Sequence, residues 1–344
     1  MNRARIASIA ALAVALSAGV LAAPPSGATS GQIATVAAGE SHTCALLPTG
    51  TVRCWGLSSS GQIGNGTTSG FARKPQKVPS VSGAIAIAAG AAHTCALRQA
   101  GYVKCWGANY GGQLGNDTVR DAPRVVSVLG LTSVAAISAS GGHTCALMKA
   151  GNVKCWGANN SGVLGTGGTT NKTKPASVVG LAGVASISTG NQDTCALLKN
   201  GTVKCWGYNG DGELGLGIRN GPDSCPFSDF VTVCSKTPVT VPGLTGVAAI
   251  NVGNNATCAL LKNGTVKCWG YNGEGELGNG TTAPALTPVS VSGLGGANSV
   301  TTGGRHACAE MKNAVAKCWG ENIYGQLGNG TTKNSTRPTV VVFL

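Results

Sequence analysis

Two stretches of the chain, HTCALLPTGTVRCWG at residues 42–56 and DTCALLKNGTVKCWG at residues 193–207, show a unit that the sequence repeats six times. In every copy two cysteines stand ten positions apart, and the second is followed by Trp-Gly. This tripeptide contains all six tryptophans of the protein: Trp55, Trp106, Trp156, Trp206, Trp269 and Trp319. Such regularity predicts a fold made of stacked copies of one supersecondary unit.

The spacing of the units and the residues between them indicate an all-β propeller. Successive first cysteines are 51, 50, 50, 63 and 50 residues apart, a period of about fifty with one insertion. Short runs of Val, Ile, Thr and Ala alternate with turns, and no apolar pattern of period 3.6 lasts long enough for a substantial helix. Each unit supplies enough strands for one four-stranded antiparallel blade, and blades stacked radially form a β-propeller.

The loop between the paired cysteines predicts which cysteines are bonded. A three-residue hairpin loop with Gly201 at its last, left-handed position makes Leu198 and Thr202 a hydrogen-bonded pair. Counting outward then places Cys195 opposite Cys205 at a non-hydrogen-bonded site, where Cα atoms approach to about 4.5 Å. The same count in every unit gives Cys44–Cys54, Cys95–Cys105, Cys145–Cys155, Cys195–Cys205, Cys258–Cys268 and Cys308–Cys318.

The first 28 residues have the form of a secretory signal peptide. Arg3 and Arg5 precede an apolar stretch from residue 6 to 21, and we expect cleavage after Ala28. An uncleaved membrane anchor is the alternative, although the apolar core is short for a bilayer span. The mature domain would cover residues 29–344 and lie outside the cell, with no further membrane association. A periplasmic or cell-surface location is the alternative, and a cytoplasmic location would require that the signal be misread.

The cysteine count and the charge fit an exported binding protein. Fourteen cysteines in regular pairs, with no CxxC and no zinc-finger histidines, favour disulfides and predict neither metal nor cofactor. The formal charge is +13, or +11 without Arg3 and Arg5, which suggests an acidic partner. Only 4% of the residues are aromatic, so that nothing besides the positive charge supports nucleic-acid binding. We also expect the protein to be a monomer.

The repeat resembles the regulator-of-chromosome-condensation family, which includes alpha-tubulin-suppressor-like proteins. The resemblance rests on VAAGESHTCAL from Val36, IAAGAAHTCAL from Ile87 and the CWGxNxxGQLGNG pattern at residues 105–116 and 318–330. The resemblance implies a propeller, usually of seven blades. Members of the family include a guanine-nucleotide exchange factor for a small GTPase and secreted inhibitors of β-lactamases. The repeat motif itself carries neither activity, because a fold does not determine function.

The number of units favours six blades, with seven as the alternative. The C-terminal stretch at residues 337–342 looks like the strand at residues 237–241, which links two interior units. If the chain is joined circularly, this stretch runs into residues 32–36. We therefore expect the ring to close by strand exchange between the termini.

Most polar residues of interest recur in several units at the same position and are expected to be structural. His42, His93, His143 and His306 all stand two residues before a first cysteine, where two other units have Asp193 and Ala256. A catalytic base would be expected once, beside a nucleophile. The acidic turns at residues 208–215 and 271–278 suggest calcium, but Gln62, Gln113 and Gln326 occupy the position of their second acidic residue, Glu213 or Glu276.

One basic residue precedes each second cysteine, and propeller symmetry would arrange the six as a ring. A ring of cations could attract an acidic partner or an anionic polymer. The alternative is that these residues occupy solvated strand positions or form ion pairs between blades. The ring consists of Arg53, Lys104, Lys154, Lys204, Lys267 and Lys317.

The insertion at residues 217–236 in the fourth unit is the element that breaks the repeat. Cys225 and Cys234 are its own cysteines, and we expect them to pair and stiffen a projecting loop. A rigid aromatic tip with charged neighbours is what a protein-binding hot spot requires. The alternative is a surface loop whose Phe227 and Phe230 side chains fold back onto the propeller. The candidate partner-binding residues are Arg219, Asp223, Phe227, Asp229 and Phe230.

The function we predict is that of a secreted, disulfide-stabilised propeller that binds another protein, in the manner of an inhibitor, and is not an enzyme. Exchange activity on a small GTPase is the alternative that the family resemblance implies. A glycan-binding or lyase-type enzyme working in the central channel is a further alternative. No catalytic residues are assigned, because the sequence offers only repeated positions around that channel.

Overall fold

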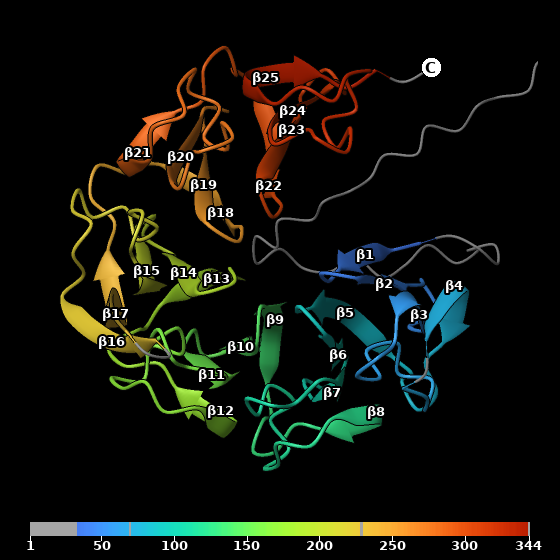
Figure 1. Ribbon diagram of the computed structural model, residues 1–344. Coiled ribbons are helices and arrows are strands. Elements are labelled where there is room, and N and C mark those ends of the chain that lie inside the picture. The colour runs from blue at the N-terminus through green and yellow to red at the C-terminus, as the bar shows by residue number, and fades with distance from the viewer. Residues whose placement is uncertain (1–32, 69, 228–229, 343–344) are drawn as a thin grey trace, which may run out of the picture.

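The computed structural model of the protein describes residues 33–68, 70–227 and 230–342, so the expected signal peptide lies outside it. The described residues form six antiparallel sheets that follow one another around a central axis (Figure 1). This is the expected all-β propeller of six blades. No helix in these ranges is long and apolar enough to cross a membrane.

The first three blades each consist of four consecutive strands. Blade 1 contains β1 (Thr35–Ala38), β2 (His42–Leu46), β3 (Val52–Leu57) and β4 (Phe71–Lys77). Blade 2 contains β5 (Ala84–Ala89), β6 (His93–Arg98), β7 (Val103–Gly107) and β8 (Ala122–Ser127). Blade 3 contains β9 (Val134–Ser140), β10 (His143–Met148), β11 (Val153–Gly157) and β12 (Lys172–Ser177).

The fourth blade has a fifth strand, which the insertion supplies. Blade 4 contains β13 (Val184–Thr189), β14 (Asp193–Leu198), β15 (Val203–Tyr208), β16 (Asp223–Phe227) and β17 (Phe230–Thr240), in the spatial order β13-β14-β15-β17-β16. Blade 5 contains β18 (Val247–Val252), β19 (Ala256–Leu261), β20 (Val266–Gly270) and β21 (Ala285–Ser290). Blade 6 contains β22 (Ala297–Thr302), β23 (His306–Met311), β24 (Ala316–Gly320) and β25 (Ser335–Val340).

Because every blade repeats one up-and-down path, the propeller has two different faces. The hairpin face holds the loop between the second and third strands of each blade, such as residues 198–202, and the linkers between blades, such as residues 178–183. The turn face, at the opposite strand ends, holds the long loop between the third and fourth strands, such as residues 108–121. The first strand of each blade lines the central channel.

The hairpin register is the one predicted from the sequence. The Leu198 N–H donates to the Thr202 carbonyl at 2.8 Å, and Gly201 has a positive φ of 86°. Cys195 therefore faces Cys205, with a Cα–Cα distance of 4.1 Å, and the other five repeat bridges have the same distance. Each bridge closes a short loop and contributes on the order of 2 to 3 kcal/mol to stability.

The tryptophans join neighbouring blades. The indole N–H of Trp156 donates to the carbonyl of Gln113 in the preceding blade at 2.9 Å, and the ring is fully buried. The ring lies so close to Gly115 that a Cβ at this position would be 2.8 Å from its nitrogen. The equivalent bonds are Trp106 to Gln62, Trp206 to Val163, Trp269 to Glu213 and Trp319 to Glu276, at 2.7 to 2.9 Å.

The expected strand exchange between the termini is wrong. Within the described ranges β25 pairs with β24 in the register that the outer strands of blades 2, 3 and 5 share, and β1 pairs with β2. Each blade is therefore completed by its own consecutive strands, so that among the described strands none is left over to be exchanged. Trp55, in blade 1, is only half-buried, whereas the other five tryptophans are fully buried.

The last hairpin provides a direct test of the loop geometry. Ala314 holds the left-handed position with a φ of 62°, where Gly201 stands in blade 4. A left-handed residue with a Cβ costs about 1 to 2 kcal/mol, partly offset by the greater freedom of glycine in the unfolded chain. We expect Ala314→Gly to raise the free energy of unfolding by about 0.5 to 1 kcal/mol in urea titrations.

Gly201→Ala is the matched control. No atom would lie within 4 Å of the added Cβ, so that only the φ strain changes and stability should fall by a similar amount. If Ala314→Gly leaves the protein no more stable, strain at the left-handed position is not what limits this loop.

Candidate functional site

The insertion forms a β-hairpin at the outer edge of blade 4 (Figure 1). The C-terminal part of β17 pairs with β15 as far as Tyr208 opposite Cys234, and its N-terminal part runs past the end of β15 and pairs with β16. Cys225 and Cys234 form a disulfide with a Cα–Cα distance of 6.0 Å. The β16–β17 hairpin thus extends beyond the blade on the turn face and carries its own covalent bridge.

The charged residues predicted to surround the aromatic tip instead hold the hairpin in place. Asp223 accepts the Lys236 N–H at 2.9 Å and lies 4.0 Å from the ammonium group of the same lysine. Arg219 lies 3.5 Å from Asp211 in the preceding turn. Gly221 lies against the Cys234 backbone, where a Cβ would collide with the carbonyl. These contacts fix the base of the hairpin to blade 4.

The remaining predicted residues lie at the end of the hairpin. The backbones of Phe227 and Phe230 face each other as the last register pair. Their side chains and the whole of Asp229 lie outside the described residues. Val231, next to Phe230, is 72% exposed. The structure therefore brings the predicted residues onto one element and divides them between its base and its tip.

Three of the four histidines lie between blades. The His93 ring contacts Thr144 of the next blade, with 2.8 Å between Nε2 and Oγ1, and burial lowers the pKa of His93 to about 3. His42 and His143 make the same contact with Thr94 and Thr194, and burial lowers the pKa of each, to about 4 and about 3. Neutral, fully packed imidazoles of this kind have a structural role.

Blade 4 has a carboxyl group at the position of this histidine. Asp193 is fully buried against Thr257 of blade 5, and among the described residues neither of its carboxyl oxygens has a hydrogen bond of good geometry. Burial raises the pKa of Asp193 well above its usual range, and the nearby Glu213 raises it further. Burial also raises the pKa of Glu213 to about 7. Two adjacent carboxyl groups that favour the neutral form therefore lie between blades 4 and 5.

The acidic turns that suggested calcium make the hydrogen bond that glutamine makes in other blades. Glu213 Oε2 accepts the Asp211 N–H at 2.9 Å, as Gln113 Oε1 accepts the Gly111 N–H at 2.9 Å. In the part of the chain that the structure describes, no three His, Cys, Asp or Glu side chains are grouped to hold a metal ion. The turns are therefore explained by their backbone contacts.

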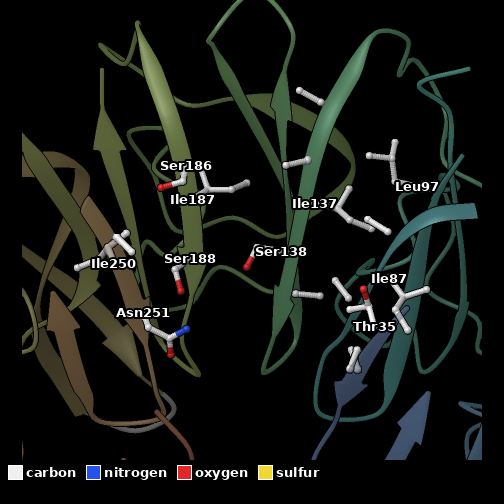
Figure 2. Close-up of a pocket in the computed structure, with 18 of the residues that line it drawn as sticks. Thr35, Ile87, Leu97, Ile137, Ser138, Ser186, Ile187, Ser188, Ile250 and Asn251 are labelled. Carbon is white, nitrogen blue, oxygen red and sulfur yellow. The ribbon is translucent and has the colours of Figure 1, made fainter. Parts of the chain in front are cut away.

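The central channel is lined by the first strands of the blades (Figure 2). A cavity of about 370 Å³ is bordered mainly by alanine and isoleucine side chains, with hydroxyl and amide groups such as Ser138, Ser188 and Asn251. Several of these polar groups bond across blades, for example Ser138 with Thr189 at 2.8 Å. Among the described residues that line this cavity there is no acid, base or histidine, whereas a second cavity lined by the same strands includes Glu40.

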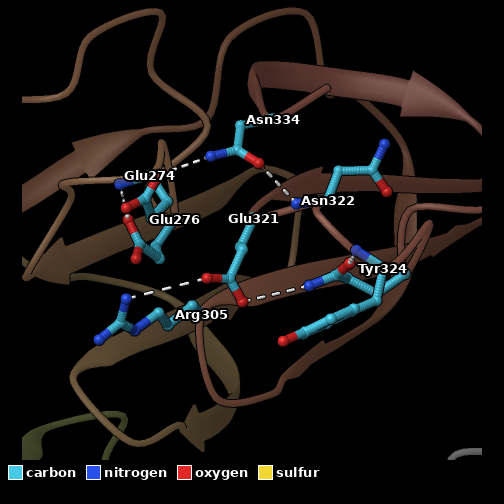
Figure 3. A network of polar contacts seen from close by, with 8 residues as sticks. Glu274, Glu276, Arg305, Glu321, Asn322, Tyr324 and Asn334 are labelled. Carbon is cyan, nitrogen blue, oxygen red and sulfur yellow. Dashed lines mark hydrogen bonds and ion pairs between the residues drawn. The ribbon is translucent and has the colours of Figure 1, made fainter. Parts of the chain in front are cut away.

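Carboxylates of the turn face take part in polar contacts within blade 6 and between blades 5 and 6 (Figure 3). Glu321 lies 3.8 Å from Arg305 and accepts a hydrogen bond from Gln326 at 3.2 Å. Glu274 accepts a hydrogen bond from Asn334 of the next blade. The turn face thus combines acidic and basic groups in local contacts.

The six basic residues that precede the second cysteines occupy equivalent registers on the third strands. Lys204 faces Ala196 on the second strand and Thr240 on the fourth, and Lys154 has the same neighbours in blade 3, Ala146 and Ser177. Arg53 is exposed and the five lysines are half-buried. The structure therefore shows the repeated arrangement around the axis, at the strand ends nearest the hairpin face.

The repeated blades and their disulfides define a class of repeat propeller. Comparison with known families shows which family the chain belongs to. Residues 20–309 match the model of the RCC1-like domain, and residues 318–344 match the regulator of chromosome condensation (RCC1) repeat. The first match covers most of the chain, so the protein belongs to the RCC1-like domain family.

Curated relatives share part of the repeat region. The human probable E3 ubiquitin-protein ligase HERC4 is 39% identical over 92 residues, which is 26% of this chain and 9% of that protein. The ultraviolet-B receptor UVR8 of Arabidopsis thaliana is 37% identical over 103 residues, which is 29% of this chain and 23% of the receptor. The matched stretch thus spans less than a quarter of either relative.

Solved structures share the propeller fold. Yeast RCC1 (Prp20), solved bound to Kap60, superposes with a TM-score of 0.77 at 22% identity, over 90% of this chain and 75% of that one. Human WBSCR16 gives a TM-score of 0.78 at 22% identity, over 92% and 83%. The ectodomain of the receptor kinase CR4 from Physcomitrella patens gives 0.52 at 22% identity, over 84% and 61%. At these identities the likeness concerns the fold alone.

Sequence reasoning missed the proximity of Asp193 and Glu213. The signal was present, because Asp193 replaces a histidine and Glu213 replaces a glutamine in the same unit. What the sequence could not show is that both side chains are buried near each other at one interface between blades.

This interface predicts a protein that is less stable at neutral than at acidic pH. When folding raises the pKa of a carboxyl group, the folded state favours the protonated form. The protein is then most stable below the unfolded pKa of that group, and this stability is lost as the pH rises through the folded pKa. For Glu213 the window runs from about 4.5 to about 7. We expect Glu213 alone to lower the free energy of unfolding by on the order of 2 to 3 kcal/mol across it, and Glu213→Gln to remove that part while the part due to Asp193 remains.

Gln113→Glu is the matched control. It places a carboxyl group at the buried equivalent position in blade 2, and we expect it to add a pH dependence of the same sign. Chemical denaturation at pH 5 and pH 8 measures both effects. A wild-type protein that is equally stable at the two pH values would contradict the assignment.

Proposed function

We propose that the protein is an exported, disulfide-braced propeller that binds another protein, in an inhibitor-like manner, through the β16–β17 hairpin. The observation that carries the proposal is the hairpin itself, which interrupts the repeat and extends past blade 4 with a disulfide of its own. The regular blades serve as the scaffold that holds it.

The hairpin has the physical properties of a preorganised binding element. Its base is held by the Cys225–Cys234 disulfide, the Asp223–Lys236 contacts and the pairing of β17 with β15. An element that is already ordered loses little conformational entropy on binding, so that more of the contact energy appears as affinity. The predicted contact residues at its tip are Phe227 and Phe230, of the apolar kind that forms the centre of protein interfaces.

Three observations support export. The chain begins with a sequence of signal-peptide form. Seven disulfides form within the described residues and leave no free cysteine among them, a state that an oxidising compartment favours. The receptor-kinase ectodomain of similar fold shows that such propellers occur outside cells.

The proposed role is not enzymatic. The ligase activity in the name of HERC4 belongs to a longer protein. The stretch that matches this chain makes up 9% of that protein. Prp20p of Saccharomyces cerevisiae, which is described as binding Gsp1p and histones, is only 22% identical to this chain. A channel bordered by alanine, isoleucine and small polar side chains favours a structural axis over a lyase or glycan site.

Replacing Phe227 and Phe230 with serine tests the proposal. We expect capture of the protein partner from culture supernatant, quantified by mass spectrometry, to fall by about tenfold or more, because each hot-spot side chain contributes about 2 kcal/mol or more. The disulfide and the base of the hairpin remain intact in this variant.

Phe71→Ser is the control, since Phe71 is 60% exposed on the outer strand of blade 1. This change should leave capture unaltered. If the double variant captures the partner as well as the wild type does, the hairpin is not the binding site.

A further inference from the structure

Positive charge gathers on the hairpin face. The six ring residues are joined there by five more basic residues at or next to the tips of the hairpin loops, which makes eleven. The five are Arg98, Lys149, Lys199, Lys262 and Lys312. No aspartate or glutamate occurs in the hairpin loops or in the linkers between blades. Glu310, half-buried on β23, is the one carboxylate at that end of a described strand, and it accepts a hydrogen bond from Ser299 at 3.4 Å.

None of the eleven forms an ion pair within the described ranges. The four ion pairs found there all involve the turn face, the outer strands or the insertion. The contacts that the basic groups of the hairpin face do make are with backbone carbonyls, such as Lys104 with Ser80 at 3.4 Å and Lys317 with Gly293 at 3.5 Å. The charge of this face is therefore not neutralised within the described part of the chain.

The tip lysines are presented from identical, fixed backbone positions. The Lys199 N–H donates to the carbonyl of Gly183 in the adjoining linker at 2.9 Å. Lys149, Lys262 and Lys312 make the same bond to Ser133, Gly246 and Gly296, at 2.8 to 3.0 Å. Each of the four side chains is exposed. The result is an arc of equivalent cations across blades 3 to 6.

The cations stand at two levels, the exposed tip lysines and the half-buried ring lysines. In blade 6 a hollow of about 270 Å³ is bordered by the exposed tip residue Lys312 and the half-buried ring residue Lys317, with Gly295, Gly296 and Asn313 beside them. Asn200 and Asn263, equivalent to Asn313, use their side-chain oxygens to accept backbone N–H groups at 3.0 Å, which leaves their NH₂ groups available as donors. Amide donors next to ammonium groups suit a ligand with both hydroxyl and anionic groups.

We propose that the hairpin face is a binding surface for a linear anionic polysaccharide that carries carboxylate or sulfate groups. Equivalent cations repeated around the ring match a partner whose own charge repeats, and in blade 6 the recessed Lys317 borders a hollow that such a chain can enter. A flat lipid surface would meet only the tips. Nine of the eleven residues are lysine, a point charge that suits diffuse attraction, whereas arginine and stacked aromatics are typical of nucleic-acid sites.

This surface is separate from the β16–β17 hairpin, which extends from the turn face of blade 4. The proposed protein-binding role can therefore fail while polysaccharide binding holds, and the reverse is equally possible. Variants of the tip lysines and of Phe227 and Phe230 distinguish the two.

Substitution of Lys149, Lys199, Lys262 and Lys312 with glutamine tests the surface, with heparin and polygalacturonate as probes. We expect affinity at physiological salt to fall on the order of tenfold or more, because counterion release at four contacts is lost. The slope of log K against log salt concentration should decrease in magnitude by about 3. Thermal unfolding of the variant should match that of the wild type, since the side chains are exposed.

The control replaces four basic residues away from the hairpin face, Lys74, Arg120, Lys172 and Lys333, with glutamine. Net charge then changes equally, and binding should remain within about twofold of the wild type. Equal losses in the two variants would show attraction to net charge alone and overturn the proposal. It would also be overturned if anionic phospholipid vesicles, polyglutamate or duplex DNA bound more tightly than both polysaccharides.

Discussion

The hydrogen bond from a buried tryptophan to the preceding blade sets the geometry of the whole propeller. A buried indole must satisfy its N–H, and here the partner is a backbone carbonyl in a tight turn of the preceding blade, so that the bond holds two neighbouring blades together at this point. Because five interfaces use the same bond, equivalent residues of successive blades stand at the same height. A basic residue at a repeated position therefore becomes part of an arc, and the charge of the repeat accumulates on one face.

Local geometry made the blades predictable. The register of each hairpin follows from one loop of three residues, so that the sequence alone was sufficient to pair Cys195 with Cys205 and to predict all six bridges. The closure of the ring involves residues some 300 positions apart and no local signal, and there the prediction of strand exchange failed. The Trp269 contact with Glu213 spans 56 residues, and only the structure shows that it places Glu213 beside Asp193.

The candidate surfaces differ in how far the sequence reveals them. The insertion stood out as a break in the repeat, but Arg219 and Asp223 proved to be anchors of the hairpin base. The basic ring was visible as a repeated residue before each second cysteine. The contribution of tip residues such as Lys199 was missed, although Lys-Asn recurs in three units, because only the structure shows the hairpin tips and linkers as one face free of carboxylates.

If the blade repeat builds one rigid cationic face that binds a polyanion, a bound polyanion should cover the lysines of that face together. Acylation of lysine side chains, mapped by mass spectrometry with and without heparin, measures this coverage residue by residue. We expect Lys149, Lys199, Lys262 and Lys312 to lose reactivity together, while Lys333 on the turn face and Lys174, paired with Asp117 at 2.7 Å, do not change. Uniform protection of all lysines, or protection of Lys333 and Lys174 alone, would show that the hairpin face is not the binding surface.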